Sequence, residues 1–439
     1  MRAQTSKAQI REVFPMFTKL RLQNFKSFGD TSFALDPFTL LIGSNASGKS
    51  NVRDALRILH GVGRGYSVAE ILGEKWAEGG VRVWTGVRGG AGQAVRYGAD
   101  DGTFEIDAEF TVPSSSDPAK SIPMRYRISI EATGNAPAIV GEALWEKSKY
   151  VFETHPEGIG LGAGAARRTL KARVRSRGGR PPEQIFLTDR PLLTQVLEPG
   201  ATSQSNRDAA RRAQQFLGAM RFLDLDPDAA RRSSQRGITT LGDRGDNLSS
   251  VLAALSETET AREVLTSWIR ALTPMDAVDL RFEDDLNGNT LAVLLEGNGN
   301  ETPLTSASDG TVRFLAMVAA MLHESSPRVL FFEELENGIH PHRVDLLLDL
   351  IETSVRESAA QVIATSHSPQ LLEHGYHAEN ARPVLIARSQ DGNSSAWDVK
   401  SEKSITEVID QDDLSDLMSD GWFEDIAALT GDASPEEAQ

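Results

Sequence analysis

Residues 43–50 read Gly-Ser-Asn-Ala-Ser-Gly-Lys-Ser and match the phosphate-binding pattern G-x-x-x-x-G-K-[ST] in full. The apolar run 38–42 before this octet predicts a buried strand, and residues 51–60 after it carry apolar side chains at helical spacing. A strand, a glycine-rich loop and a helix are the context in which backbone N–H groups and a helix start bind phosphate. The competing interpretation is a chance glycine-rich turn, but such a turn would not require an apolar strand before it and a helical pattern after it.

Individual residues of the octet have expected roles. The ammonium group of Lys49 is expected to bind nucleotide phosphates, and the hydroxyl of Ser50 to ligate Mg²⁺. The remaining residues expected at the nucleotide in this region are Gly43, Asn45, Ser47, Gly48 and Asn51.

Composition narrows the class of protein. The chain has 439 residues, enough for two or three compact units, with 40% hydrophobic residues and a net charge of −16. It contains no cysteine, which excludes disulfides, thiol catalysis and thiolate zinc sites and fits a reducing cytoplasm. We expect a protein that neither spans a membrane nor is secreted, because no long apolar run or signal peptide is present. The acidic balance argues against indiscriminate binding to nucleic acid but leaves room for a local basic groove.

Hydrophobic periodicity predicts a mixed α/β chain. Its alternating stretches predict strands, and its 3.6-residue patterns predict helices. The expected strands cover 17–25, 31–36, 93–98, 103–112, 122–131, 137–147, 276–284, 289–296, 329–332 and 361–365, and the expected helices cover 205–220, 247–257, 259–272, 311–323, 341–357 and 369–373. Residues 155–182, rich in Gly, Arg and Pro, are expected to form a loop or a mobile hairpin.

A second motif lies at the end of the expected strand 329–332. Two carboxylates, Glu333 and Glu334, follow its four apolar residues. In an open α/β sheet the strand would carry both acids to the edge where ligands bind. Glu333 is then expected to hold Mg²⁺, and Glu334 to orient or deprotonate the attacking water. Two solvated acids after a strand are the alternative interpretation.

Two further segments carry polar groups after or before regular elements. Ser308 and Gly310 form a Ser-x-Gly turn at the start of an expected helix, where an anion or an ordinary helix cap would fit. His367 follows the strand 361–365, where an imidazole could donate to a phosphate or to the attacking water. A lone histidine is more often structural.

These four motifs, together with Leu-Gln-Asn-Phe-Lys-Ser-Phe at 22–28, resemble the ABC-type ATPases of the SMC, RecF and OLD (overcoming lysogenization defect) group. The resemblance implies an ABC-ATPase head with a mixed sheet core, an N-terminal antiparallel β subdomain and an inserted helical lobe. It also implies a homodimer that closes over two ATP molecules, with Ser308 and Gly310 of one copy on the γ-phosphate held by Lys49 of the other. In this group the Ser-x-Gly turn is the signature motif, the paired acids are the Walker B end and His367 matches the switch histidine.

The implied domain organisation divides the chain into five parts. They are a flexible extension at 1–15, the N-terminal part of the head at 16–150, an inserted basic hairpin and helical lobe at 151–290, the C-terminal part of the head at 291–400 and an acidic tail at 401–439.

Two departures from the group affect the expected activity. Glu333 stands where Asp is usual, so turnover is expected to be slow. The glutamine that usually contacts Mg²⁺ in this group is not fixed by the sequence, and the candidates are Gln184, Gln195, Gln204, Gln214 and Gln215.

Beyond His367 we expect no Toprim nuclease domain, because no βα framework surrounds the acidic run Asp410, Asp412 and Asp413. This region is expected to be a solvated tail with a short helix near 414–418.

A basic run elsewhere in the chain could follow a nucleic-acid backbone or contact an acidic protein surface. Its members are Arg167, Arg168, Lys171, Arg173, Arg175, Arg177 and Arg180.

Three functions fit these observations. The favoured one is an ATP-gated dimeric ATPase in a DNA transaction or in anti-phage defence, controlling a separately encoded effector. The alternatives are a RecF-like repair protein on gapped DNA and a scaffold that binds ATP with little hydrolysis.

Overall fold

The computed structural model describes residues 14–99, 102–114, 117, 119–133, 136–154, 169–176, 183–272, 277–322, 328–340, 343–357 and 360–409. The chain forms two compact units, one of residues 1–34 and 54–219 and the other of residues 35–53 and 220–439. The segment 151–290, expected as one inserted lobe, is therefore divided after Ala219. In the described part of the chain, no helix has the length and apolar character needed to cross a bilayer.

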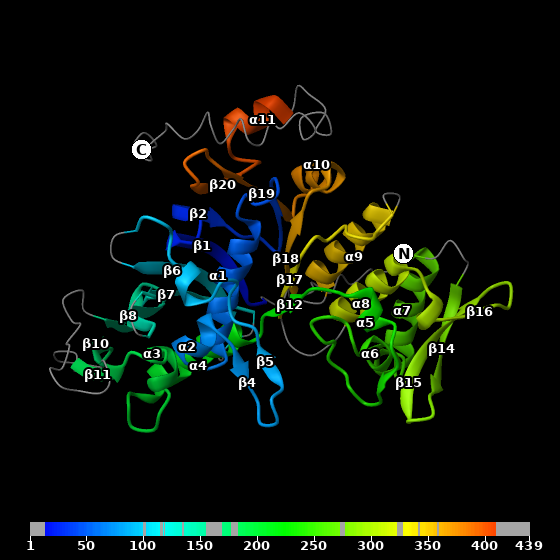
Figure 1. Cartoon of the computed structure of the whole chain (residues 1–439), viewed down its shortest axis with the longest axis horizontal. Coiled ribbons are helices and arrows are strands. Elements are labelled where there is room, and N and C mark those ends of the chain that lie inside the picture. The colour runs from blue at the N-terminus through cyan, green and yellow to red at the C-terminus, as the bar shows by residue number, and fades with distance from the viewer. Residues whose placement is uncertain are drawn as a thin grey trace, which may run out of the picture. The chain divides into compact units, whose positions relative to one another are not determined.

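The first unit is built on an antiparallel sheet in the order β11-β10-β9-β8-β7-β6-β1-β2 (Figure 1). Alternate residues of its long strands are buried, and Phe216 of α4 packs on Phe17 and Phe110 with ring centroids 4.8 Å apart in each pair. Its elements are β1 (Met16–Phe25), β2 (Phe28–Ala34), α2 (Val68–Leu72), β4 (Lys75–Trp76), β5 (Arg82–Trp84), η1 (Ala91–Gln93), β6 (Thr103–Pro113), β7 (Ser121–Glu131), β8 (Ala138–Glu146), β9 (Lys149–Thr154), β10 (Thr169–Val174), β11 (Glu183–Leu187), α3 (Leu192–Gln195) and α4 (Gln204–Gly218).

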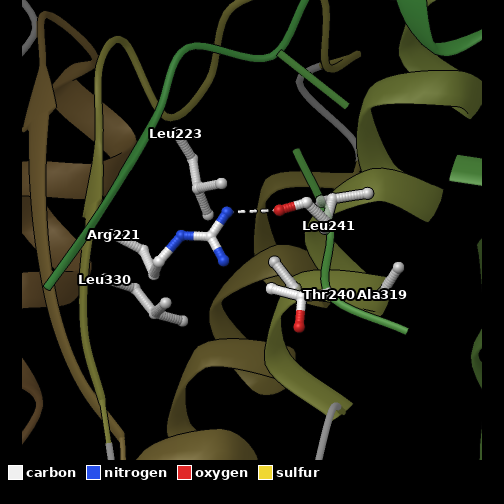
Figure 2. Close-up of a pocket in the computed structure, with 7 residues that line it drawn as sticks. Arg221, Leu223, Thr240, Leu241, Ala319 and Leu330 are labelled. Carbon is white, nitrogen blue, oxygen red and sulfur yellow. Dashed lines mark hydrogen bonds between the residues drawn. The ribbon is translucent and has the colours of Figure 1, made fainter. Parts of the chain in front are cut away.

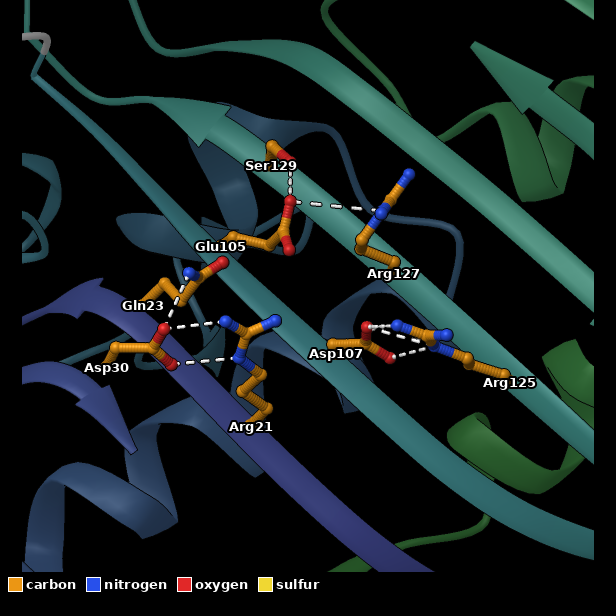
Figure 3. A network of polar contacts seen from close by, with 8 residues as sticks. All are labelled: Arg21, Gln23, Asp30, Glu105, Asp107, Arg125, Arg127 and Ser129. Atoms are coloured by element: carbon orange, nitrogen blue, oxygen red, sulfur yellow. Dashed lines mark hydrogen bonds and ion pairs between the residues drawn. The ribbon is translucent and has the colours of Figure 1, made fainter. Parts of the chain in front are cut away.

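Cross-strand charge pairs line the outer face of this sheet (Figure 3). Arg21 of β1 pairs with Asp30 of β2 at 2.6 Å, and Arg125 of β7 pairs with Asp107 of β6 at 2.5 Å. Arg125 also stacks on Trp145 of β8, 5.2 Å from the ring centroid. The Arg21–Asp30 pair is exposed and is expected to contribute about 0–1 kcal/mol, whereas Asp107 is buried beneath Arg125, and both pairs help to fix the strand register.

The second unit is built on a mostly parallel sheet in the order β20-β19-β3-β18-β17-β12, in which only β19 and β20 pair antiparallel. A smaller sheet of β13–β16 lies beside α6 and α7 (Figure 1). The elements are β3 (Phe38–Ile42), α1 (Lys49–Gly63, which continues into the first unit), β12 (Arg221–Leu223), α5 (Pro227–Ala230), β13 (Ser234–Gln235), α6 (Leu248–Leu255), α7 (Glu259–Leu272), β14 (Ala277–Asp284), β15 (Asn289–Glu296), β16 (Glu301–Pro303), η2 (Leu304–Ser306), α8 (Asp309–Leu322), β17 (Arg328–Phe332), α9 (Val344–Glu357), β18 (Ala360–Ser366), α10 (Pro369–His377), β19 (Ala381–Arg388), β20 (Ser394–Asp398) and α11 (Lys403–Ile409).

The core of the second unit surrounds α8, which contacts α5, α6, α7 and α9 and is buried along nearly its whole length. A helix that is apolar on all sides is typical of such a central position. The expected mixed α/β class is thus confirmed.

Two sequence expectations are corrected. The strand expected at 93–98 is wrong: a 3-10 turn occupies 91–93, and Val95 makes only an isolated bridge to Phe25. The nearby glycines Gly89, Gly90 and Gly98 adopt positive φ angles, which interrupt an extended strand. Residues 155–182 were expected to form a loop or a mobile hairpin, and the loop alternative is wrong for residues 169–174. These residues form β10, in which Leu170, Ala172 and Val174 alternate as buried residues, and β10 pairs antiparallel with β9 and β11.

Candidate functional site

Three neighbouring parallel strands bring the predicted site residues to one edge of the second unit's sheet. β18 lies between β3 and β17, and all three run in the same direction. Their carboxyl ends lead into the glycine loop, the Glu333–Glu334 pair and His367. This is the edge at which open α/β sheets bind ligands, so the topology assembles a site from segments far apart in the sequence.

The glycine loop is shaped by close backbone contacts. Gly43 has φ +152°, and a Cβ at this position would lie 2.0 Å from the carbonyl oxygen of Ile386. Gly48 has φ +122°, and α1 begins at the next residue, Lys49. Ser394 of β20 donates its hydroxyl to the Ser47 carbonyl at 2.6 Å, which anchors the middle of the loop. The loop therefore has the tight curvature that points backbone N–H groups at an anion.

Lys49 is 6% exposed and donates to the carbonyl oxygens of Gly43 at 2.5 Å and Ser44 at 2.8 Å. Burial lowers its pKa to about 8, against the opposing fields of Glu334 and Glu336. The hydroxyl of Ser47 is buried without a hydrogen-bond partner among the described residues. A nucleotide phosphate would supply both the anion that Lys49 lacks and an acceptor for Ser47, so the residues present fit that group.

The paired acids lie in different environments. Glu333 faces Arg53 of α1, with Nε and Oε1 3.7 Å apart. Glu334 is exposed and has φ +47°, a conformation that non-glycine residues rarely adopt. Its backbone N–H donates to Thr365 Oγ1 at 2.9 Å, and Asn337 donates to its carboxylate at 3.2 Å. Strained backbone of this kind clusters at functional sites.

His367 shares this environment. Burial is the main cause that lowers the pKa of its imidazole, and the positive charge of Lys49 adds to the effect. Glu336, Glu334 and a hydrogen bond with the Gly43 backbone act in the opposite direction. The charges of Lys49, Glu334 and Glu336 therefore all act on the imidazole of His367.

The Ser-x-Gly turn caps α8. Thr311 N–H donates to Ser308 Oγ at 3.3 Å, which is the geometry of an N-cap, and Ser308 itself is exposed. Gly310 packs against the loop after the paired acids, where a Cβ would lie 2.5 Å from the Gly338 carbonyl oxygen. The turn thus presents an exposed hydroxyl and a helix start, and both the cap and the anion-site interpretations remain compatible with it.

Two residues that the sequence motifs did not identify, Arg231 and Glu336, hold the predicted site segments in place. Arg231 donates to the Ala307 carbonyl through Nε at 3.1 Å and Nη2 at 2.9 Å and pairs with Asp309, so it braces the Ser308 turn. Glu336 accepts hydrogen bonds from Ser366 and His367. Arg231 lies outside every motif and carries no sequence signal, whereas Glu336 lies two residues after the Glu333–Glu334 pair and could have been noticed by that proximity.

The basic run is only partly described. Arg167, Arg168, Arg177 and Arg180 lie outside the described residues, and Lys171, Arg173 and Arg175 lie on or just after β10. Arg173 pairs with Glu153 at 2.5 Å and stacks on Tyr150, while Arg175 contacts Glu146 at 3.4 Å. These two charges brace the sheet of the first unit, and a role in nucleic-acid or partner binding stays a prediction.

One candidate glutamine, Gln195, has a structural role instead of a place at the site. Gln195 is buried and bonds the backbone of Leu187 and Arg190, which is a structural role. The acidic tail from 410 onward lies outside the described residues.

A small pocket in the second unit lies between β12, β17 and α8 (Figure 2). It is lined by Arg221, Leu223, Thr240, Leu241, Ala319, Ala320 and Leu330, and the Arg221 guanidinium donates to the Leu241 carbonyl.

Within the described ranges, no three His, Cys, Asp or Glu side chains gather as a metal centre. A Mg²⁺ held by Ser50, Glu333 and substrate phosphates needs no such cluster.

The sheet topology and the loop geometry define an α/β P-loop nucleotide-binding domain. Residues 38–373 match the family described as "AAA domain, putative AbiEii toxin, Type IV TA system". The chain belongs to this family of AAA domains, and the expectation of a P-loop ATPase family is confirmed at that level. A comparison with curated proteins gave no match.

Several solved structures are distantly similar to this chain. The SMC head bound to the C-winged helix domain of ScpA is 16% identical, with 88% of this chain and 99% of that chain covered and a TM-score of 0.49. The SMC head domain from Thermotoga maritima is 13% identical, with 87% and 98% covered and a TM-score of 0.40. The ScpA-bound SMC head with an extended coiled coil from Pyrococcus furiosus is 13% identical, with 90% and 100% covered and a TM-score of 0.46. These likenesses are distant, and the family assignment rests on the sequence match.

Proposed function

We propose that this protein is an ATPase that binds ATP and Mg²⁺ between two copies of the chain and uses ATP-dependent closure to control a partner effector in anti-phage defence. The observation that carries the proposal is the convergence of Lys49, Glu334 and His367 at the carboxyl ends of β3, β17 and β18. The family description, which names a putative toxin of a toxin–antitoxin system, supports a defence role with a separately encoded partner.

The chemistry follows from the residues at this edge. Lys49 and the loop N–H groups bind the β- and γ-phosphates, and Ser50 and Glu333 would hold a Mg²⁺ ion, which would supply positive charge beside these phosphates. Glu334 accepts a proton from the attacking water as the new bond to the γ-phosphorus forms and the bond to the β-phosphate oxygen breaks. Neutral His367, favoured by its burial, donates a hydrogen bond to the phosphate or the water.

Closure explains the exposed Ser308 turn. The hydroxyl of Ser308 and the start of α8 are available to a γ-phosphate held by another copy, because Ser308 is exposed and Arg231 holds the turn in place. Hydrolysis then removes the shared ligand, so the two copies separate.

Glu334→Gln tests the proposal. The variant keeps the size of the side chain but cannot accept a proton, so we expect loss of ATP turnover, retained ATP binding and accumulation of ATP-bound dimers. Glu373→Gln, an exposed glutamate on α10, is the matched control and is expected to behave as wild type. A non-hydrolysing scaffold would show the same low turnover and the same assembly with and without the Glu334 change, which would overturn the enzymatic proposal.

A further inference from the structure

The loop after β17 is fastened to the end of β18 by four hydrogen bonds. The N–H groups of Glu334 and Leu335 donate to Thr365, at 2.9 Å to its hydroxyl and 3.0 Å to its carbonyl. The Ser366 hydroxyl and the His367 N–H both donate to Glu336 Oε1, at 3.0 and 2.7 Å. The segment that carries the proposed general base and the segment that carries the proposed switch histidine are thus held as one piece.

Glu336 is the side chain that makes this connection. One carboxylate oxygen accepts both bonds from the 366–367 backbone and side chain, and the other is buried without a hydrogen-bond partner among the described residues. A half-buried carboxylate with an unsatisfied oxygen costs free energy, so its retention here needs a compensating role.

The opposite end of the same loop touches the Ser308 turn. The Gly338 carbonyl oxygen approaches Gly310 so closely that a Cβ there would lie 2.5 Å away. A displacement of the start of α8 would therefore displace the loop 334–338. Through the hydrogen bonds of Glu336, this movement would also displace His367.

We propose that Glu336 is a positioning residue that sets the place of His367 relative to the glycine loop and couples it to the Ser308 turn. This inference rests on the proposed ATPase function. Glu336 acts through the length of its side chain and through one acceptor oxygen, because Oε1 receives the hydrogen bonds of both the Ser366 hydroxyl and the His367 N–H.

Two substitutions separate position from charge. Glu336→Gln keeps the side-chain length and an acceptor oxygen, so we expect near wild-type kcat. Glu336→Asp keeps the charge but is one methylene shorter and cannot hold both donors, so we expect kcat to fall by about 10²-fold at unchanged ATP affinity. In a His367→Ala background, Glu336→Asp should cost little more, because both changes act through the same imidazole.

A second readout needs no nucleotide. Hydrogen exchange of the peptide that contains residues 363–368 should accelerate in Glu336→Asp, which loses the acceptor of the His367 N–H, and stay protected in Glu336→Gln. Glu352→Ala is the matched control, because Glu352 forms a 3.0 Å contact with His374 between α9 and α10 and should change neither readout.

The inference is overturned if Glu336→Gln is as impaired as Glu336→Asp, if the two substitutions show wild-type exchange, or if the effects of Glu336→Asp and His367→Ala on kcat are additive. Failure of the proposed function looks different: wild-type protein would show no ATP turnover, while the exchange experiment would still report whether Glu336 holds the His367 segment.

Discussion

The ammonium nitrogen of Lys49 lies 2.5 Å from the carbonyl oxygen of Gly43, the first residue of its own loop. Two backbone carbonyls thus hold a buried cation that has no carboxylate partner within the loop. Burial lowers the pKa of Lys49 to about 8, because the charges of Glu334 and Glu336 offset only part of the desolvation of its ammonium group. Phosphate binding would replace weak dipoles with full negative charges.

Replacement of Lys49 by alanine is expected to abolish ATP binding, because it removes the main cation of a buried cradle. Titration calorimetry with ATP measures the effect directly. Lys400→Ala is a suitable control, since Lys400 also donates to two carbonyls, those of Ala378 and Ala381, but belongs to the turn after β20. It should reduce stability and leave ATP binding intact. Retained affinity in Lys49→Ala would contradict the assigned site.

The lowered pKa of Lys49 makes ATP binding dependent on pH. In the nucleotide-free protein this lysine loses its proton near pH 8, whereas bound phosphates favour the ammonium form, so binding above that pH requires proton uptake. Affinity is expected to be level below pH 7 and to fall about tenfold per pH unit above pH 8. Calorimetry in buffers of different ionisation enthalpy should detect the proton. An affinity that stays constant between pH 7 and 9.5 would count against a buried, phosphate-binding Lys49.

Substitution of Ser308 by arginine is expected to leave ATP binding by single copies intact but to prevent ATP-dependent dimerisation, because a long cation replaces the small exposed hydroxyl at the proposed contact. Sedimentation velocity with and without ATP checks both states. Thr258→Arg offers a comparable change, since Thr258 caps α7 as Ser308 caps α8. Normal dimerisation of Ser308→Arg would remove the two-sided site.

Arg231→Ala tests the brace behind the same turn. The change removes two hydrogen bonds to the Ala307 carbonyl and the ion pair with Asp309. We expect ATP-dependent dimerisation to weaken by about tenfold, while ATP affinity of single copies stays unchanged. Arg262→Ala, which breaks an exposed pair with Asp279, should have no effect on assembly. If both variants dimerise equally well, the turn does not need Arg231.

The parts of the fold that follow from local patterns were predictable from the sequence. Strand β3, helix α1 and strand β17 with its terminal acids combine strong periodicity with a motif, and each formed within a few residues of the expected bounds. For β10 the choice between a loop and a hairpin stayed open, because the basic residues Lys171 and Arg173 obscured the alternation of Leu170, Ala172 and Val174.

Tertiary contacts determine the parts of the candidate site that the sequence did not predict. The bond from the His367 N–H to Glu336 joins two loops that only the order β18-β17 brings together, and the contact of Arg231 with Ala307 spans separate elements. No local propensity encodes such pairs. The motifs therefore predicted which residues the ends of β3, β17 and β18 bring together, but not which residues hold them in place.

Cross-linking between copies tests the central claim most directly, because a chain without cysteine permits single thiols to be placed freely. One Glu334→Gln preparation would carry Asn45→Cys and a second would carry Ser308→Cys, both at exposed positions. After mixing with a short bis-maleimide, we expect a covalent dimer with ATP and none with ADP. Absence of that product under saturating ATP, or an equal yield without nucleotide, would contradict a nucleotide enclosed by the glycine loop of one copy and the Ser308 turn of the other.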